Sequence, residues 1–293
     1  MGFLSGLVLG FVGSRSHATR DALARFFGTL AYGLGIRLKV ALDNLAHAFP
    51  EKSEAERRAI ARGAYVNMAR VVLESIASGE RLHAGWQQDP VHGEEAFRRL
   101  RAHVDSGKGA LLATAHFGNW EVLAELLTHH GIPFDALVRP LKGALNTRLA
   151  ENRLRAGVGL IYPKGAIVEA GAALRRGESV LMLLDQALPA KAAVFVPFFG
   201  RLASTTPALA VAAQRTGAPV YVVMGMRDAR GRVQLHVQGP VDAPPRGTPE
   251  LFTEHTARVT AALEAVIRQH PEQWLWLHRR WKVAPPAQRE KKA

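Results

Sequence analysis

Apolar and polar positions follow two different periods along this chain. Within residues 20–78 the apolar side chains recur at helical spacing, most clearly at 22–30 and 60–72. Glu56 lies three residues after Ser53, which fits a capping box at the start of the second stretch. The pattern predicts an amino-terminal layer of helices.

From residue 110 onward, short apolar runs of strand length alternate with helical patterns. The strand candidates are residues 110–115, 134–138, 159–162, 180–184, 194–198, 220–224 and 233–237, and the helix candidates are residues 144–155, 166–175, 207–215 and 249–270. Strands separated by helices predict an α/β fold with a mostly parallel sheet whose faces are covered. The run 233–237 alternates apolar with polar residues, which predicts an edge strand.

Length and composition indicate one large core. The chain has 293 residues, of which 48% are hydrophobic. We expect a single domain over residues 1–283, with a helical, membrane-associated part at 1–78 and an α/β core at 79–283. Residues 284–293, rich in Pro, Lys and Ala, are expected to form a disordered tail.

The charge balance narrows the choice of partners. A formal net charge of +13 favours an anionic membrane surface, a phosphorylated lipid or an acidic carrier protein. Nucleic acid is excluded as a partner because the chain has no recognition-helix, zinc-finger or RNP-like pattern. The sequence contains no cysteine, which rules out disulfides, thiol nucleophiles and Cys-ligated zinc. We expect no metal site.

The apolar run at residues 3–12 bears on membrane attachment. It is shorter than the roughly 20 residues that span a bilayer, and it lacks the basic start and cleavage site of a signal peptide. We expect it to insert into one leaflet as an interfacial segment. The alternative is a helix end packed on the core.

The strongest chemical signal is the pair His116 and Glu121. The buried run 110–115 leads through Gly118 into a helical pattern, which predicts a strand, a tight turn and a helix. His116 would then lie at the carboxyl edge of the sheet, where reactive groups of open α/β sheets gather. Imidazole can remove the proton of an attacking hydroxyl, and a carboxylate on its other ring nitrogen fixes the tautomer. The spacing alone favours the alternative, a histidine bound to a backbone carbonyl and an acidic residue near a helix N-terminus.

The surrounding sequence decides between these readings. Several blocks resemble, in order, the bacterial lipid A biosynthesis acyltransferases, the late lauroyl and myristoyl transferases, together with their phosphatidylinositol mannoside acyltransferase relatives. The matching blocks are residues 44–51, 116–121 (His-Phe-Gly-Asn-Trp-Glu), 138–142, 185–186, 194–200, 205–207 and 274–282. The resemblance runs from about Arg37 to Lys282. Many members begin with a longer membrane anchor than residues 3–12 provide.

The resemblance implies a glycerol-phosphate-acyltransferase-like α/β fold, a His-x4-Asp/Glu dyad formed here by His116 and Glu121, and an active site at a membrane face. It also implies an acyl thioester of acyl carrier protein or coenzyme A as co-substrate, with no further cofactor. The acceptor implied is a glycolipid hydroxyl, in first place that of a lipid A precursor.

Five further residues are candidates for substrate binding. Arg139 follows the second strand and could clamp a phosphate, since guanidinium binds phosphate bidentately; the alternative is a solvated loop cation. Asp185 and Gln186 end a strand and could position the acceptor or hold Arg139, or Asp185 could cap a turn. Asn119 could donate to the developing oxyanion or cap the next helix. Arg155 could contact a phosphate or remain a solvated surface residue.

These expectations combine into one function. We expect a monomeric, membrane-associated O-acyltransferase at the cytoplasmic face of the inner membrane, with His116 as general base and Glu121 orienting it. The alternatives are another glycolipid or phospholipid acceptor, or a non-catalytic lipid-binding protein on the same fold. The intact pair of His116 and Glu121 argues against the last.

Overall fold

The structure is a computed structural model that describes residues 16–77, 91–139 and 144–285. The expected amino-terminal helical layer is present and contains α2 (His17–Gly33), α3 (Leu38–Ala48) and α4 (Glu54–Ala77). The capping box forms as predicted: the N–H of Ser53 donates to Glu56 Oε2 at 2.8 Å, and the N–H of Glu56 donates to Ser53 Oγ at 3.3 Å. The apolar run 3–12 and residues 286–293 of the expected tail lie outside the described residues.

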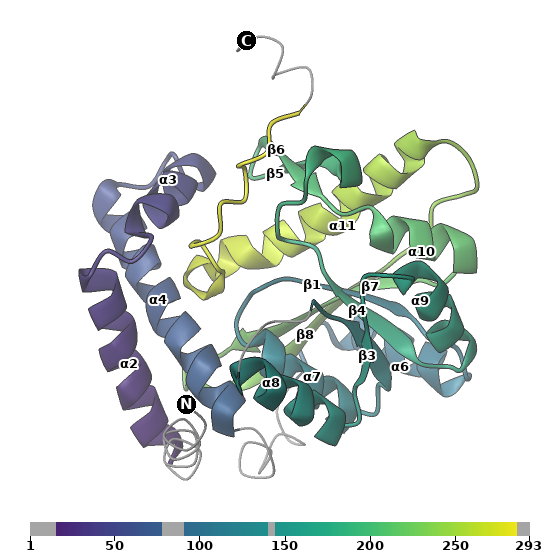
Figure 1. Cartoon of the computed structure of the whole chain (residues 1–293), viewed down its shortest axis with the longest axis horizontal. Helices are drawn as coiled ribbons and strands as arrows, with labels where there is room; N and C mark the ends of the chain where they lie inside the picture. Colours follow the sequence, from purple (N-terminus) through teal and green to yellow (C-terminus); the bar gives the residue numbers. More distant parts are fainter. Residues whose placement is uncertain (1–15, 78–90, 140–143, 286–293) are drawn as a thin grey trace.

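A six-stranded sheet in the order β3-β2-β4-β1-β7-β8 forms the centre of the molecule (Figure 1). Its strands are β1 (Leu111–Thr114), β2 (Phe134–Leu137), β3 (Gly159–Ile161), β4 (Ser179–Leu183), β7 (Val220–Arg227) and β8 (Val233–Val241). Neighbouring strands are parallel except for β8, which pairs antiparallel with β7 at one edge. The mostly parallel sheet and the edge strand are therefore confirmed.

Helices cover both faces of the sheet. Helices α6 (Glu94–Asp105) and α7 (Trp120–His129) pack on one face, where Leu112 of β1 points. Helices α9 (Ala166–Arg175), α10 (Ala208–Thr216) and α11 (Pro249–Gln269) cover the other face, where Leu111 and Ala113 point. Because both faces are covered, all four residues of β1 are buried and the strand shows no alternation.

The run 194–198 differs from the expectation that it belongs to the main sheet. It forms β5 (Val194–Phe198), which pairs with β6 (Arg201–Thr205) in a separate antiparallel hairpin. The chain reverses at Phe199 and Gly200, both with positive φ, so there is no crossover that could bring the next strand in parallel. The hairpin packs against α11.

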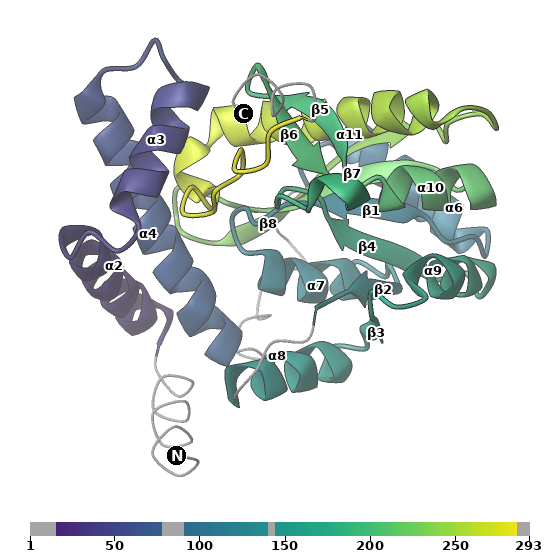
Figure 2. The same cartoon turned by 45° about the horizontal axis from the view of Figure 1, so that its top comes forward.

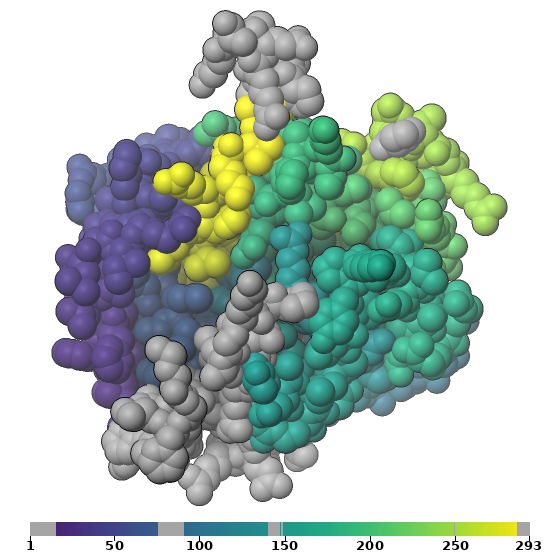
Figure 3. All heavy atoms as spheres, viewed as in Figure 1, coloured from purple at the N-terminus to yellow at the C-terminus, as the bar shows by residue number. Residues whose placement is uncertain are grey.

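The helical layer stands beside the carboxyl edge of the sheet. Helix α4 contacts α7 and the short helix η3 (Pro271–Gln273), and α8 (Ala144–Arg155) also contacts α4 (Figure 2). The carboxyl-terminal segment, yellow in Figure 3, runs over the surface between the helical layer and the α/β part. Among the helices of the described residues, none combines the length and the apolar character needed to cross a bilayer.

Candidate active site

The loop between β1 and α7 carries His116 and turns sharply, as predicted. Gly118 has a φ of 55°, and a Cβ atom there would lie 1.8 Å from the carbonyl oxygen of Gly225. The N–H of Gly118 donates to the carbonyl of Gln273 at 2.9 Å, and the N–H of Asn119 donates to that of Gly225 at 2.9 Å. Only glycine fits this turn without strain or a clash, so Gly118 fixes the direction in which His116 leaves the sheet.

Asn119 caps α7. Its Oδ1 accepts from the N–H groups of Glu121 at 3.1 Å and Val122 at 3.0 Å, and its Nδ2 donates to Glu74 Oε2 at 2.6 Å. The residue is 0% exposed. The structure therefore gives Asn119 the capping role instead of contact with substrate, and it occupies two amide groups of the first turn that could have formed an oxyanion site.

The imidazole of His116 is held by Asp185, at the end of the neighbouring strand β4. Asp185 Oδ1 lies 2.8 Å from His116 Nδ1, and Asp185 Oδ2 accepts from the backbone N–H of His116 at 2.9 Å. The indole Nε1 of Trp274 donates to the same Oδ2 at 2.9 Å. Three donors thus fix the carboxylate, and the carboxylate fixes the ring.

The second ring nitrogen of His116 faces outward. Because an ionised carboxylate only accepts, Nδ1 carries the hydrogen and Nε2 keeps its lone pair. The amide Nε2 of Gln186, an exposed residue, lies 3.2 Å from this atom and donates to it. The His116 side chain is 20% exposed, against 3% for Asp185. A hydroxyl arriving from solvent can therefore reach Nε2.

The electrostatics of the pair favour an ionised Asp185. Burial opposes charge on this carboxyl, but the charge and hydrogen bonds of His116 with the bond from Trp274 lower its pKa to about 2. For His116, burial lowers the pKa, while the charge and hydrogen bond of Asp185 and the charge of Glu121 raise it above 6.5 overall. The imidazole is therefore a stronger base than a free histidine.

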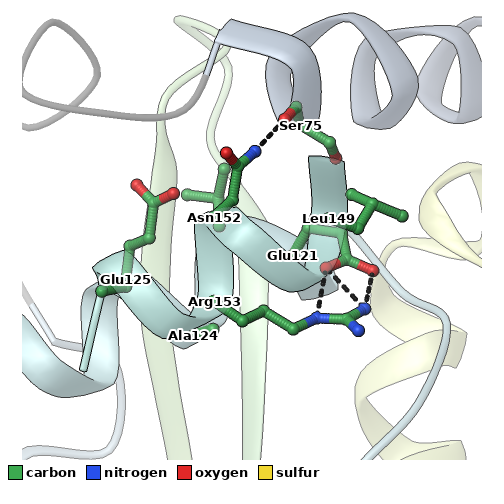
Figure 4. Close-up of a pocket in the computed structure, with 9 residues that line it drawn as sticks. Ser75, Glu121, Ala124, Glu125, Leu149, Asn152 and Arg153 are labelled. Carbon is green, nitrogen blue, oxygen red and sulfur yellow. Dashed lines mark hydrogen bonds and ion pairs between the residues drawn. The ribbon is translucent and has the colours of Figure 1, made fainter. Parts of the chain in front are cut away.

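Glu121 is arranged differently from the prediction that it orients His116. Its carboxylate forms a bidentate pair with Arg153 of α8, whose Nη2 lies 2.7 Å from Oε1 and 2.8 Å from Oε2 (Figure 4). Asp185 occupies the position expected for Glu121, at Nδ1, because β4 lies beside β1 and the loops after the two strands meet. Glu121 acts on His116 through its charge, and its part in the reaction stays a prediction.

A buried polar network lies behind the loop. Arg227, at the end of β7, places Nη1 2.9 Å from Glu74 Oε1 and Nη2 2.7 Å from Glu74 Oε2. Asn67 Nδ2 donates to the carbonyl oxygens of Gly118 at 2.9 Å and Gln273 at 3.1 Å. Since Glu74 also accepts from Asn119, helix α4 is bonded directly to the turn that carries His116.

The two arginine candidates lie apart from this centre. Arg139 is exposed just beyond β2, and β4 separates β2 from β1, so the strands that lead to Arg139 and to His116 are not neighbours. Asp185 is bonded to His116 and Trp274, which corrects the idea that it holds Arg139. Arg155 is exposed and bonds to Asn152 and Glu151 of its own helix. The phosphate-binding role of both arginines stays a prediction.

Sequence reasoning missed Arg153, Trp274, Glu74 and Arg227. Arg153 is two positions from Arg155 on α8, and only the docking of that helix decides which of them faces Glu121. Trp274 belongs to the carboxyl-terminal block that carried the resemblance, which was the one available signal. Glu74 and Arg227 are 153 positions apart in the chain, and no local pattern connects them.

A histidine held by a buried carboxylate at the carboxyl edge of a parallel sheet, with its other nitrogen open to solvent, is a centre for base catalysis on a hydroxyl. The model of the bacterial lipid A biosynthesis acyltransferase family matches residues 3–283, and the chain belongs to that family.

Curated relatives support this membership. The chain is 30% identical over 258 residues to the lipid A biosynthesis lauroyltransferase of Escherichia coli K12, covering 85% of this chain and 80% of the relative. It is 26% identical over 289 residues to the lipid A biosynthesis palmitoleoyltransferase of the same strain, covering 95% and 86%. A lipid A biosynthesis acyltransferase of Haemophilus influenzae is 24% identical over 289 residues, covering 94% and 85%.

Proposed function

We propose that this protein transfers a fatty acyl chain from a thioester of acyl carrier protein or coenzyme A to a hydroxyl of a lipid A precursor, at the cytoplasmic face of the inner membrane. The observation that carries the proposal is the geometry of His116, whose Nδ1 is held by Asp185 while Nε2 is open. Family membership supplies the reaction class.

In the proposed reaction, the acceptor hydroxyl binds at His116 Nε2, in place of or beside the amide of Gln186. Nε2 takes the hydroxyl proton as the oxygen attacks the thioester carbon, and Asp185 stabilises the imidazolium that forms. The amide of Gln186, which donates toward the same point, is placed to support the developing oxyanion. When the carbon–sulfur bond breaks, the imidazolium returns the proton to the thiolate, which leaves an ester and a free thiol.

Glu121 and Arg153 act beside this centre. The charge of Glu121 favours the imidazolium, and the side chain of Arg153 is 21% exposed, so its guanidinium can meet an anionic group of either substrate. Acyl transfer to another glycolipid or to a phospholipid would use the same residues.

The test is transfer of a labelled acyl chain by the purified protein in lipid and detergent. Acyl carrier protein and coenzyme A thioesters are compared as donors, and a lipid A precursor, other glycolipids and phospholipids as acceptors. We expect labelled lipid A precursor with the native protein and none with His116→Ala, while His129→Ala, at the far end of α7, keeps its turnover. Stoichiometric binding of lipid without any labelled product would assign the chain to lipid-binding proteins instead.

A further inference from the structure

Helix α2 packs on the protein with its small residues and turns its large apolar residues outward. Ala24 and Gly28 are buried against the neighbouring helix. A Cβ atom at Gly28 would lie 2.6 Å from Cα of Val66 in α4, so the two helices touch backbone to backbone. Tyr32 packs on Tyr65 of α4 near the end of the helix, with ring centroids 5.6 Å apart, whereas Phe26 and Phe27 stay outside this contact.

The outward side forms what we call the α2 apolar face. It consists of Phe26, Phe27, Leu30, Leu34 and Ile36, which are 63%, 49%, 46%, 69% and 51% exposed. Phe26, Leu30 and Leu34 are four residues apart and therefore lie in one row along the helix. These five are half of the large apolar side chains that are exposed in the described part of the chain. A contiguous surface of this kind marks a binding site.

The charges around this face select its partner. Arg25, Arg37 and Lys39 are exposed beside it; Arg25 pairs with Asp21 and Lys39 with Asp43, while Arg37 donates to the carbonyl of Leu277. The whole chain carries a net charge of +13, so two copies of this chain repel each other, whereas an anionic leaflet attracts it. We propose that the α2 apolar face inserts into an anionic lipid leaflet, with the flanking cations at the level of the headgroups.

The position of α2 connects this surface with the reaction. Helix α2 packs on α4, as Figures 1 and 2 show, and α4 bonds through Asn67 and Glu74 to the loop that carries His116. Docking of α2 therefore holds the carboxyl edge of the sheet one helix layer from the headgroups. The inference rests on the proposed function, in which the acceptor is a membrane lipid.

The absence of cysteine permits a direct test with the full-length chain. A single cysteine at Leu34 or Phe26 is labelled with an environment-sensitive fluorophore and mixed with vesicles of phosphatidylglycerol and phosphatidylethanolamine, or of phosphatidylcholine alone. The matched control is Val168→Cys on α9, at a site that is 71% exposed but outside the face. We expect a blue shift and a several-fold rise in emission at Leu34 and Phe26 with anionic vesicles, and no change at Val168.

A second arm measures vesicle flotation and turnover of the variant F26S/L30S/L34S. We expect its partition into anionic vesicles to fall about tenfold or more, because three large apolar side chains no longer insert. Transfer to acceptor dispersed in detergent should stay at the native level, and V168S/L202S should behave as the native protein in both assays.

Three results would overturn the inference. The first is a protein that floats with native strength although the label at Leu34 does not respond, which would place the docking surface elsewhere. The second is a lipid-free dimer that F26S/L30S/L34S dissociates, which would assign the face to a second copy. The third is equal emission changes at Leu34 and Val168. Absence of labelled product from the native protein and from every variant, with the vesicle response intact, would instead reject the proposed function and leave the surface in place.

Discussion

Glu74 of α4 and Arg227 of β7 form a bidentate ion pair in which both side chains are less than a tenth exposed. The same carboxylate accepts from Asn119, next to the turn at Gly118. The pair therefore joins the helical layer to the sheet at the back of the loop that carries His116.

Removing one partner of this pair should destabilise the protein strongly. Glu74→Gln leaves the guanidinium of Arg227 buried without a counter-charge, and we expect the free energy of unfolding to fall by about 3–5 kcal/mol. Chemical denaturation measures this change. E74M/R227M, which removes both charges, should recover a large part of the loss, and Glu95→Gln in an exposed pair should leave stability close to the native value. Equal losses of stability for Glu74→Gln and Glu95→Gln would show that the buried pair stabilises the fold no more than an exposed pair does.

Asp185→Asn should abolish most of the turnover while the substrates still bind. The amide keeps the shape of the side chain but presents a donor to one of the groups that now donate to Asp185, so His116 loses its preferred tautomer. By analogy with the Ser-His-Asp enzymes we expect kcat to fall by about 10³ to 10⁴ with a small change in KM. Steady-state kinetics on folded samples test this, and kcat within tenfold of the native value would remove Asp185 from the mechanism.

Substitutions of Glu121 and Arg153 should shift the pH dependence of kcat/KM in opposite directions. Activity needs neutral His116, so kcat/KM should rise with pH through the pKa of His116, which lies above 6.5. Glu121→Gln removes a negative charge that stabilises the imidazolium, and the rise should move down by about half a pH unit. Arg153→Gln unmasks the charge of Glu121 and should move it up. Shifts of the same sign in the two variants would contradict this arrangement.

Arg139 should matter for phosphorylated substrates alone. Its guanidinium is exposed just beyond β2 at the carboxyl edge of the sheet, where it can bind a phosphate. Arg139→Ala should raise KM more for a phosphorylated acceptor than for the same acceptor without phosphate, and Arg139→Lys should have an intermediate effect. The control is Arg175→Ala, at an exposed site at the end of α9. A uniform loss with both acceptors would make the role of Arg139 structural.

His255 should make the fold sensitive to acid. The residue is fully buried, and burial together with the charge of Arg258 lowers its pKa to about 4. Between pH 6.5 and 4 the unfolded chain binds a proton that the folded chain does not, so the free energy of unfolding should fall by about 2 kcal/mol when the pH is lowered from 7.5 to 5. Denaturation at pH 7.5 and pH 5 should show a smaller difference for His255→Leu than for the native protein. Exposed His17→Ala should leave the difference unchanged.

The sequence of this protein predicts local structure better than it predicts which distant side chains contact each other. The bounds of α8 and α9 and the strand-turn-helix at Gly118 follow from periodicity and from the conformational freedom of glycine, which are local properties. The partner of His116 does not follow from spacing. Asp185 is 69 positions away and meets His116 because β4 lies beside β1, an adjacency that depends on the order of strands in the sheet. Glu121 is the nearer carboxylate to His116 along the sequence, but the fold brings Asp185 into contact with the imidazole.

The catalytic loop depends on the last part of the described chain. The N–H of Leu275 donates to the carbonyl of His116, Gln273 accepts from Gly118, and Trp274 donates to Asp185. The base, its carboxylate and the groups that hold both come from three distant parts of the chain, so the centre is complete only when all three have docked. A chain cut before Gln273 would keep His116 and Asp185 but would lose the hydrogen bonds that fix the loop and the carboxylate. We expect such a chain to lack an ordered catalytic base.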